Sequence, residues 1–176
     1  MSPTDDLIPI LKKLRMSGVL QTLDLRTKQA VDDNLPYEEF LLRLLSDEVE
    51  RREAKRLQLR LNRADFEHAK TLNDFDFSFN EEIPKARIID LATCNFIPRY
   101  GNILLVGQAG VGKSHVAQAI GHRACLGGYS VLYVSAHKMF TQLRAARADN
   151  SYDRVMLRFT RPDLLIVDDL GLRPLR

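Results

Sequence analysis

The chain has 176 residues, 45% hydrophobic and 28% charged, so it can form a buried core, and wholesale disorder is excluded. It has no apolar run of the roughly 20 residues that a membrane span needs, no basic signal-peptide start, and too few cysteines for a disulfide scaffold or a zinc site. We therefore expect a cytoplasmic protein without membrane contact. The net charge of +3 is uneven: residues 1–90 carry 15 Lys/Arg against 18 Asp/Glu, and residues 91–176 carry 11 against 5. The basic half favours a phosphate-bearing partner or an ordinary solvated surface.

Residues 1–70 are expected to form a small helical domain for partner binding or oligomerisation. Apolar residues recur there at helical spacing in two stripes. Val19, Leu20 and Leu23 follow the first stripe after a break at Ser17-Gly18, and a further helix, which carries the second stripe, begins at Pro36. The stripes are Leu7, Ile10, Leu11 and Leu14, and then Phe40, Leu41, Leu44, Leu45 and Val49.

The end of this helical region, residues 51–63, holds six basic residues and one acidic residue. These side chains could contact nucleic-acid phosphates. Alternatively, they form a solvated helix face that lies over Leu57 and Leu61, because cations near a helix C-terminus are favourable for local reasons.

Residues 71–100 are expected to be an ordered connector that packs on the next domain. Phe75, Phe77 and Phe79 alternate with polar residues, and three exposed phenylalanines would make a poor linker. Pro84 and Pro98 bracket a short apolar helix around residues 88–91.

From residue 101 onward, the pattern alternates between strands and helices. Continuous apolar runs at 103–106, 131–134 and 164–167 predict parallel strands that are buried on both faces. Helices are predicted at 113–126, from about 136 with Ser135 as its cap, and at 152–159. This alternation predicts an α/β fold with a doubly wound parallel sheet.

The pattern G-x-x-x-x-G-K-[ST] of a phosphate loop lies between the first predicted strand and its helix. Its glycines allow tight turns, and its amide groups with the helix N-terminus form an anion site. Lys113 would bridge the β- and γ-phosphates of ATP, and the Ser114 hydroxyl would bind Mg²⁺. The predicted cofactor-binding residues are Gly107, Gln108, Ala109, Gly110, Val111, Gly112, Lys113, Ser114 and His115.

The third predicted strand ends in Asp168-Asp169, which is typical of a Walker B element. Asp168 would hold the Mg²⁺ shell, and Asp169 would polarise the attacking water as a catalytic residue beside Lys113. His115 is expected to pack or form a hydrogen bond, Cys125 to be a small buried residue, and Tyr133 to belong to the core.

Together, these residues resemble the IstB-type transposition helper ATPases of the AAA+ class, which are related to the DnaC-type helicase loaders. One departure is Gln108-Ala109, at free positions of the motif where the family commonly has two prolines. The resemblance covers nearly the whole chain and is carried by GVGKSHVA at residues 110–117, Gly128-Tyr129, Arg161-Pro162-Asp163, Asp168-Asp169-Leu170-Gly171 and Asp74-Phe75-Asp76-Phe77.

The resemblance implies an ATPase that forms ATP-dependent homo-oligomers, binds duplex DNA with little sequence preference and assists a transposase. It also implies that an extra helical element between the second and third strands faces DNA, with an ordinary solvated surface or an inter-subunit face as the alternatives. The predicted DNA contacts are Arg144, Arg147, Arg154 and Arg158. A replicative helicase loader and an inactive interaction fragment remain alternative functions, and a small-molecule kinase is more distant.

The family's sheet order, 5-1-4-3-2, implies that strand 4 lies between the phosphate-loop strand and the Walker B strand. Only eight residues follow Asp168, so we expect residues 101–176 to be a partial, C-terminally incomplete AAA+ domain without strands 4 and 5, sensor or arginine finger. We expect weakened nucleotide binding and very low ATP turnover in this form.

Overall fold

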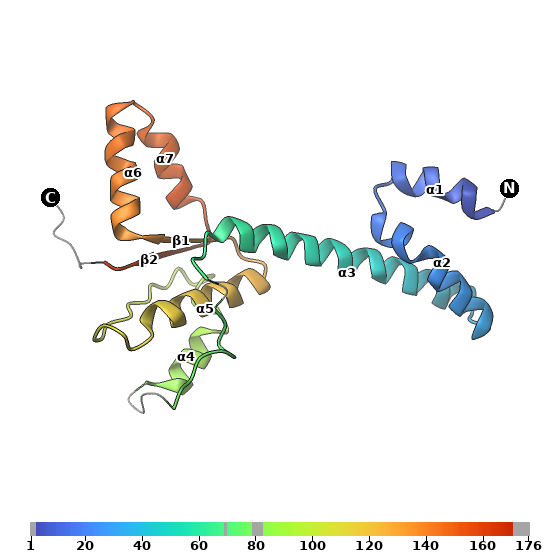
Figure 1. Ribbon diagram of the computed structural model, residues 1–176, viewed down its shortest axis with the longest axis horizontal. Coiled ribbons are helices and arrows are strands. Elements are labelled where there is room, and N and C mark those ends of the chain that lie inside the picture. Colours follow the sequence, from blue (N-terminus) through green and yellow to red (C-terminus); the bar gives the residue numbers. More distant parts are fainter. Residues whose placement is uncertain (1–2, 69, 79–82, 171–176) are drawn as a thin grey trace. The chain divides into compact units, whose positions relative to one another are not determined.

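The computed structural model describes residues 3–68, 70–78 and 83–170, which form seven helices and two strands (Figure 1). None of the described helices is both long and apolar enough to cross a lipid bilayer. The chain divides into two compact units, Met1–Arg56 and Leu57–Arg176, and the boundary falls inside the longest helix. The elements are α1 (Pro3–Lys13), α2 (Ser17–Asp32), α3 (Tyr37–Ala64), α4 (Lys85–Leu91), α5 (Lys113–Leu126), β1 (Val131–Ser135), α6 (Ala136–Ala148), α7 (Tyr152–Thr160) and β2 (Leu164–Asp168).

The first unit is helical, as predicted, and has a small core. Leu11, Val19, Leu23 and Leu44 are buried against one another, with Phe40 packed beside them. Most other residues of the two predicted apolar stripes are exposed, among them Leu7, Ile10, Leu14, Leu41, Leu45 and Val49. Helical spacing therefore identified the helices, and of the predicted apolar residues Leu11, Val19, Leu23 and Leu44 are buried.

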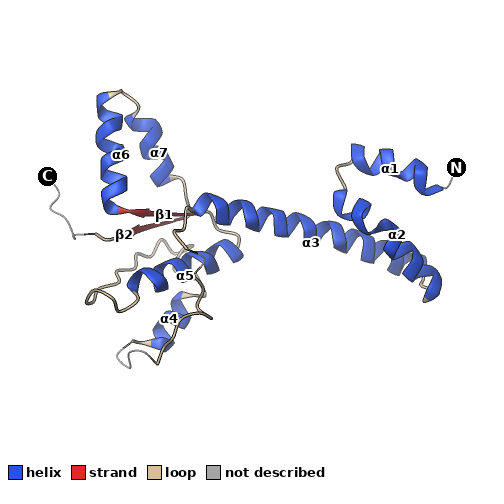
Figure 2. Cartoon of the chain, viewed as in Figure 1, coloured by secondary structure: helices blue, strands red, loops and turns tan. Residues whose placement is uncertain are grey.

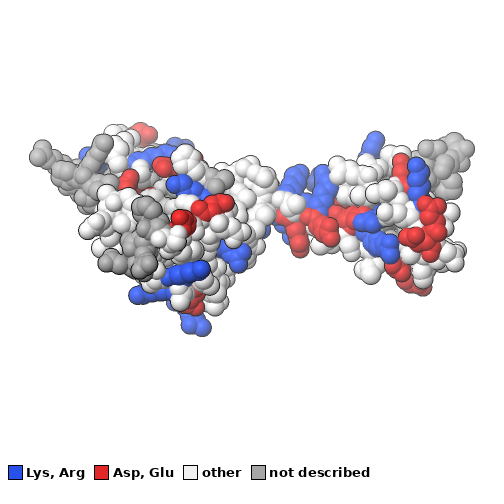
Figure 3. All heavy atoms as spheres, turned by 60° about the horizontal axis from the view of Figure 1, so that its bottom comes forward, with Lys and Arg blue, Asp and Glu red and all other residues white. Residues whose placement is uncertain are grey.

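Buried and paired carboxylates hold the helices of the first unit together. Glu48 of α3 is 4% exposed and accepts hydrogen bonds from the amides of Gly18 and Val19, at the start of α2. Asp47 accepts two hydrogen bonds from Arg26 of α2, at 2.8 and 2.6 Å, and these hold the pKa of Asp47 at about 2. Figure 3 shows basic and acidic side chains interspersed over these helices. Their charges therefore act mainly within the unit.

The second unit contains a parallel two-stranded sheet with helices on both faces. Val131 pairs with Leu164 and Ser135 with Asp168, so both predicted strands are confirmed. Leu132 and Val134 pack with Phe159 of α7. Their neighbour Val131 packs on the other side, in a cluster with α5 and the end of α3. Alternate β1 side chains thus face different helices, and the predicted α/β fold class is confirmed.

The predicted strand at residues 103–106 is wrong. Figure 2 draws the segment before α5 as loop, and Leu104 and Val106 are 81% and 82% exposed. A strand requires a hydrogen-bonding partner, and β1 and β2 pair with each other, not with this segment. This agrees with the sheet order that the resemblance implies, in which a further strand separates the phosphate-loop strand from β2.

The predicted connector packs on α5. Phe75 and Phe77 contact a cluster formed by Ile88 of α4 and by Val116 and Ile120 of α5. Their rings meet edge to face, with centroids 4.8 Å apart. The short apolar helix is confirmed as α4, and Phe79 lies outside the described residues. Residues 71–77 are therefore fixed against the helix that follows the phosphate loop.

Both cysteines are buried, and neither forms a disulfide. Cys125 lies in a core cluster with Ala64 and Ala124, and Cys94 belongs to the same cluster. Burial raises the pKa of both thiols, so they remain in the neutral form at physiological pH. The expectation that Cys125 is a small buried residue is confirmed.

Candidate functional site

The loop at residues 107–112 turns into α5 through glycines with left-handed backbone angles. The φ angles of Gly110 and Gly112 are +84° and +90°, which side-chain-bearing residues adopt only with strain. Gly112 is the N-cap of α5, and no side chain caps this end of the helix. The amides of the first turn therefore have no side-chain acceptor, and an anion could take that place.

Phe75 from the connector lies directly against the loop. A Cβ at Gly112 would stand 2.7 Å from Cε2 of Phe75, so both backbone angle and space require glycine there. The Phe75 ring also meets the His115 ring edge to face, with centroids 5.1 Å apart. Nε2 of His115 lies 2.9 Å from the carbonyl oxygen of Thr71. His115 thus has the packing and hydrogen-bonding role expected of it, and the connector supports the loop from one side.

Lys113, the motif lysine, is held close to the loop. Its Nζ donates a 2.7 Å hydrogen bond to the carbonyl oxygen of Gln108, across the loop. The ammonium group therefore lies beside the backbone at the start of the phosphate loop. A triphosphate would offer stronger, charged acceptors than one carbonyl, so this hydrogen bond is easily exchanged.

The two predicted Walker elements meet at Asp168, the last residue of β2. Its carboxylate accepts a hydrogen bond from the hydroxyl of Tyr133, and the nearby Ser114 hydroxyl favours its charged form in the same way. Burial tends to raise the pKa of Asp168, but these hydrogen bonds, the Asp169 amide and the charge of Lys113 outweigh it and hold the pKa below its ordinary value. Asp168 is therefore an anion at neutral pH, beside the phosphate loop.

Asp169 follows the strand in a left-handed conformation. Its φ is +54°, its side chain is exposed, and its amide donates a 2.9 Å hydrogen bond to Oδ1 of Asp168. Aspartate tolerates this region better than most residues. The turn directs the chain away from the strand immediately after Asp168.

These residues fit a phosphate-bound Mg²⁺. The Ser114 hydroxyl helps to lower the pKa of the Asp168 carboxyl, so the two groups are close enough to interact, and hard oxygen ligands suit this ion. Mg²⁺ usually takes only one or two protein ligands and completes its shell with phosphates and water. Within the described part of the chain, no cluster of three or more His, Cys, Asp or Glu residues could hold a metal without such help.

The four arginines predicted to contact DNA do not form one group. Arg144 and Arg147 lie on α6, and the Arg147 guanidinium stands 5.1 Å from the centre of the Tyr152 ring. Arg154 and Arg158 lie on α7 and line a shared pocket, which also includes Arg63 of α3. Nη2 of Arg158 also lies 3.6 Å from Oδ2 of Asp65.

Two of the six basic residues of segment 51–63, Arg52 and Arg60, have contacts within the protein. Arg52 pairs with Glu48, and Nε of Arg60 donates a 2.9 Å hydrogen bond to the carbonyl oxygen of Cys125. Leu57 and Leu61 pack against the core. These contacts favour a structural role for Arg52 and Arg60.

The contacts of Thr71, Phe75 and Tyr133 at this site were not predicted from the sequence. Tyr133 was predicted as a core residue; it is 3% exposed, and its hydroxyl also binds Asp168. The register supplies the missing signal, because Tyr133 pairs with Ile166, two residues before Asp168. The alternation of Phe75 and Phe77 indicated packing but not the surface that they contact.

The sequence matches the family described as IstB-like ATP binding protein over residues 9–176. It is 39% identical to a protein of Mycobacterium tuberculosis that is described as an ATP-binding protein in an insertion sequence, covering 93% of this chain and 65% of the relative. An insertion-sequence ATP-binding protein of Geobacillus stearothermophilus is 32% identical over 90% of this chain and 63% of its own length. An insertion-sequence ATP-binding protein of Pseudomonas fluorescens is 35% identical over 94% of this chain and 72% of its own length.

The chain thus spans just under two thirds of the length of the first two relatives. The matched region contains the phosphate loop, Asp168 and the connector. The chain belongs to the family of IstB-like ATP binding proteins.

Proposed function

We propose that this chain binds ATP with Mg²⁺ and acts as an ATP-dependent helper of DNA transposition that binds duplex DNA and assists a transposase. The observation that carries the proposal is the meeting of Ser114, on the phosphate-loop helix, with Asp168 at the end of β2. The names of the insertion-sequence relatives support the setting.

Each residue of the site has a distinct part in this proposal. The Lys113 ammonium holds the terminal phosphates, and the uncapped first turn of α5 receives the same anion. Ser114 and Asp168 hold Mg²⁺, which supplies charge neutralisation at the phosphates when bound. Asp169 orients the attacking water and accepts its proton. Tyr133 keeps the Asp168 carboxylate oriented.

Nucleotide binding is tested with a fluorescent ATP analogue and Mg²⁺. Lys113→Ala removes the ammonium and should weaken binding by roughly 10- to 100-fold, the range for a lost hydrogen bond to a charged group. Lys55→Ala, an exposed lysine of the first unit, is the matched control and should bind as the parent does. Equal binding by both variants would contradict the proposed site.

The role in transposition is tested with the transposase of the same insertion sequence and a duplex target. We expect the full chain to associate with the transposase and the duplex when ATP is present, and more weakly when Lys113 is replaced by Ala. If association is equally strong without ATP and with Lys113→Ala, the chain acts as an interaction protein that the nucleotide does not control.

A further inference from the structure

Among the described residues, one pocket of the second unit is lined by four arginines and by no acidic residue. Its volume is about 540 Å³, and its walls come from the end of α3, the start of β1 and the exposed face of α7. The lining residues Arg154, Leu157, Arg158 and Arg161 follow helical spacing, so they share one side of α7 and its C-cap. Arg63 of α3 completes the set from a segment about ninety residues earlier in the sequence.

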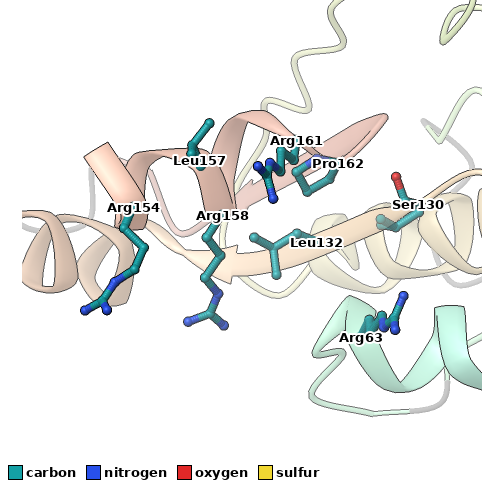
Figure 4. A pocket seen from close by; sticks show the side chains of 9 residues that line it. Arg63, Ser130, Leu132, Arg154, Leu157, Arg158, Arg161 and Pro162 are labelled. Atoms are coloured by element: carbon teal, nitrogen blue, oxygen red, sulfur yellow. The ribbon is translucent and has the colours of Figure 1, made fainter. Parts of the chain in front are cut away.

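Figure 4 shows how these guanidinium groups are arranged. Arg154 and Arg158 project from the same side of α7, and Arg63 comes from the separate helix α3. Leu132, Leu157 and Pro162 supply the apolar part of the lining. A ligand with both a negative charge and an apolar face would match this lining.

Two of the four arginines have no protein partner to satisfy them. Within the described ranges, the side chains of Arg63 and Arg161 form no ion pair, hydrogen bond or ring contact, and both are exposed. Arg158 is partly neutralised by Asp65, which also accepts a 3.1 Å bond from Lys138. Arg63 and Arg161 therefore have donors available to a ligand.

The pocket lies at the opposite end of the sheet from the phosphate loop. Ser130 and Pro162, which line it, precede the parallel strands β1 and β2, whereas Asp168 ends β2. Asp163, just before β2, links the N-terminal ends of the two strands, because its carboxylate accepts hydrogen bonds from the amide and hydroxyl of Ser130, just before β1, at 2.7 and 2.6 Å. A ligand in the pocket and a nucleotide at the loop would thus occupy separate sites.

We propose that this pocket binds a backbone phosphate and the adjoining sugar of duplex nucleic acid, with Arg63 and Arg161 as its principal contacts. The inference rests on the proposed DNA-binding function and assigns a DNA contact to this one pocket. Guanidinium groups pair with phosphate oxygens through a planar fork, and the apolar walls suit a deoxyribose face. Because such contacts read no base edges, they would give binding with little sequence preference.

The test measures binding of the full chain to a labelled 20-base-pair duplex by fluorescence anisotropy, with Mg-ATP, at several salt concentrations. Arg63→Ala and Arg161→Ala should each weaken binding and reduce the slope of log affinity against log salt by about 0.9, the value for one phosphate contact. Arg63→Lys and Arg161→Lys, which keep the charge, should retain most of that slope. Arg87→Ala on α4, also exposed, is the matched control and should leave affinity and slope unchanged.

Each outcome decides between the pocket and the broader function. If the parent chain binds the duplex and the alanine variants do so equally well, with equal slopes, the pocket proposal is wrong and DNA binding stands. If the parent chain binds no duplex, both fail, whereas nucleotide binding through Lys113 stands on its own test. If the alanine variants lose self-association but keep DNA affinity, the pocket belongs to an interface with a second copy, and the proposal is overturned. Circular dichroism melting of each variant confirms that the fold is retained.

Discussion

Two short apolar runs of the second unit, Ile-Leu-Leu-Val at 103–106 and Val-Leu-Tyr-Val at 131–134, have similar compositions and opposite environments. Residues 131–134 form β1 and are 3–4% exposed. Residues 103–106 form no strand, and two of their side chains are more than 80% exposed. The difference is the partner: β1 has β2 beside it and helices on both faces, whereas neither strand pairs with the earlier run. Aliphatic composition therefore marks a segment that can become a buried strand, and pairing decides whether it does.

The strongest test of this comparison replaces one leucine in each run. Leu132→Ala opens a cavity in the cluster with Val134 and Phe159 and should lower the free energy of unfolding by about 2–5 kcal/mol. Leu104→Ala removes a side chain that is already in solvent and should change it by less than about 0.5 kcal/mol. Urea unfolding of the full chain, followed by circular dichroism, measures both. Equal effects would show that residues 103–106 are buried in solution.

A second test concerns the loop that joins the exposed run to α5. Gly112→Ala combines the cost of a left-handed angle, about 1–3 kcal/mol, with a clash against Phe75, and should both destabilise the unit and weaken ATP binding. Gly110→Ala meets the angle cost alone, since nothing lies within 4 Å of its Cβ position. Thermal melting and nucleotide titration of both variants separate the clash from the backbone cost. A milder effect at Gly112 than at Gly110 would rule out the Phe75 contact.

The smallest effect is expected at the carboxyl end of the paired strands. Tyr133→Phe removes one hydrogen bond to Asp168 and should cost about 0.5–1.5 kcal/mol at neutral pH. The hydroxyl favours the charged carboxylate, so its loss should raise the pKa of Asp168. A carboxyl whose pKa is lowered by folding stabilises the protein above its unfolded pKa, near 4, and loses that contribution as pH falls through its folded value.

The stability difference between the parent and Tyr133→Phe should therefore be largest at neutral pH and shrink below about pH 4. Unfolding curves at a series of pH values measure it. Tyr129→Phe, whose hydroxyl forms no hydrogen bond among the described residues, provides the comparison. A difference that grows in acid would contradict the assigned direction.

The sequence predicted the elements of this fold better than their surroundings. Continuous apolar runs, helical spacing and Ser135 as a cap are local signals, and they located β1, β2 and the helices around them. Local signals could not show that residues 103–106 have no partner, because pairing is set by segments far apart in the sequence.

The candidate site divides in the same way. The phosphate-loop motif and Asp168 are visible in the sequence because their chemistry requires those residue types at those positions. The contact of Phe75 with Gly112 and the hydrogen bond of Tyr133 to Asp168 depend on tertiary packing and strand register. Likewise, Arg63 and Arg161 line the same pocket although they lie far apart in the sequence, which no local pattern encodes.

The ring of Phe75 gives the phosphate loop a mechanical link to a segment 37 residues earlier. Since the two groups are in van der Waals contact, any ligand that shifts the backbone at Gly112 must also move that ring. Binding equilibria are reciprocal. If a partner that binds residues 71–77 changes the affinity for the nucleotide by some factor, the nucleotide changes the affinity for that partner by the same factor. A partner that binds the connector would therefore respond to bound ATP without contacting the nucleotide.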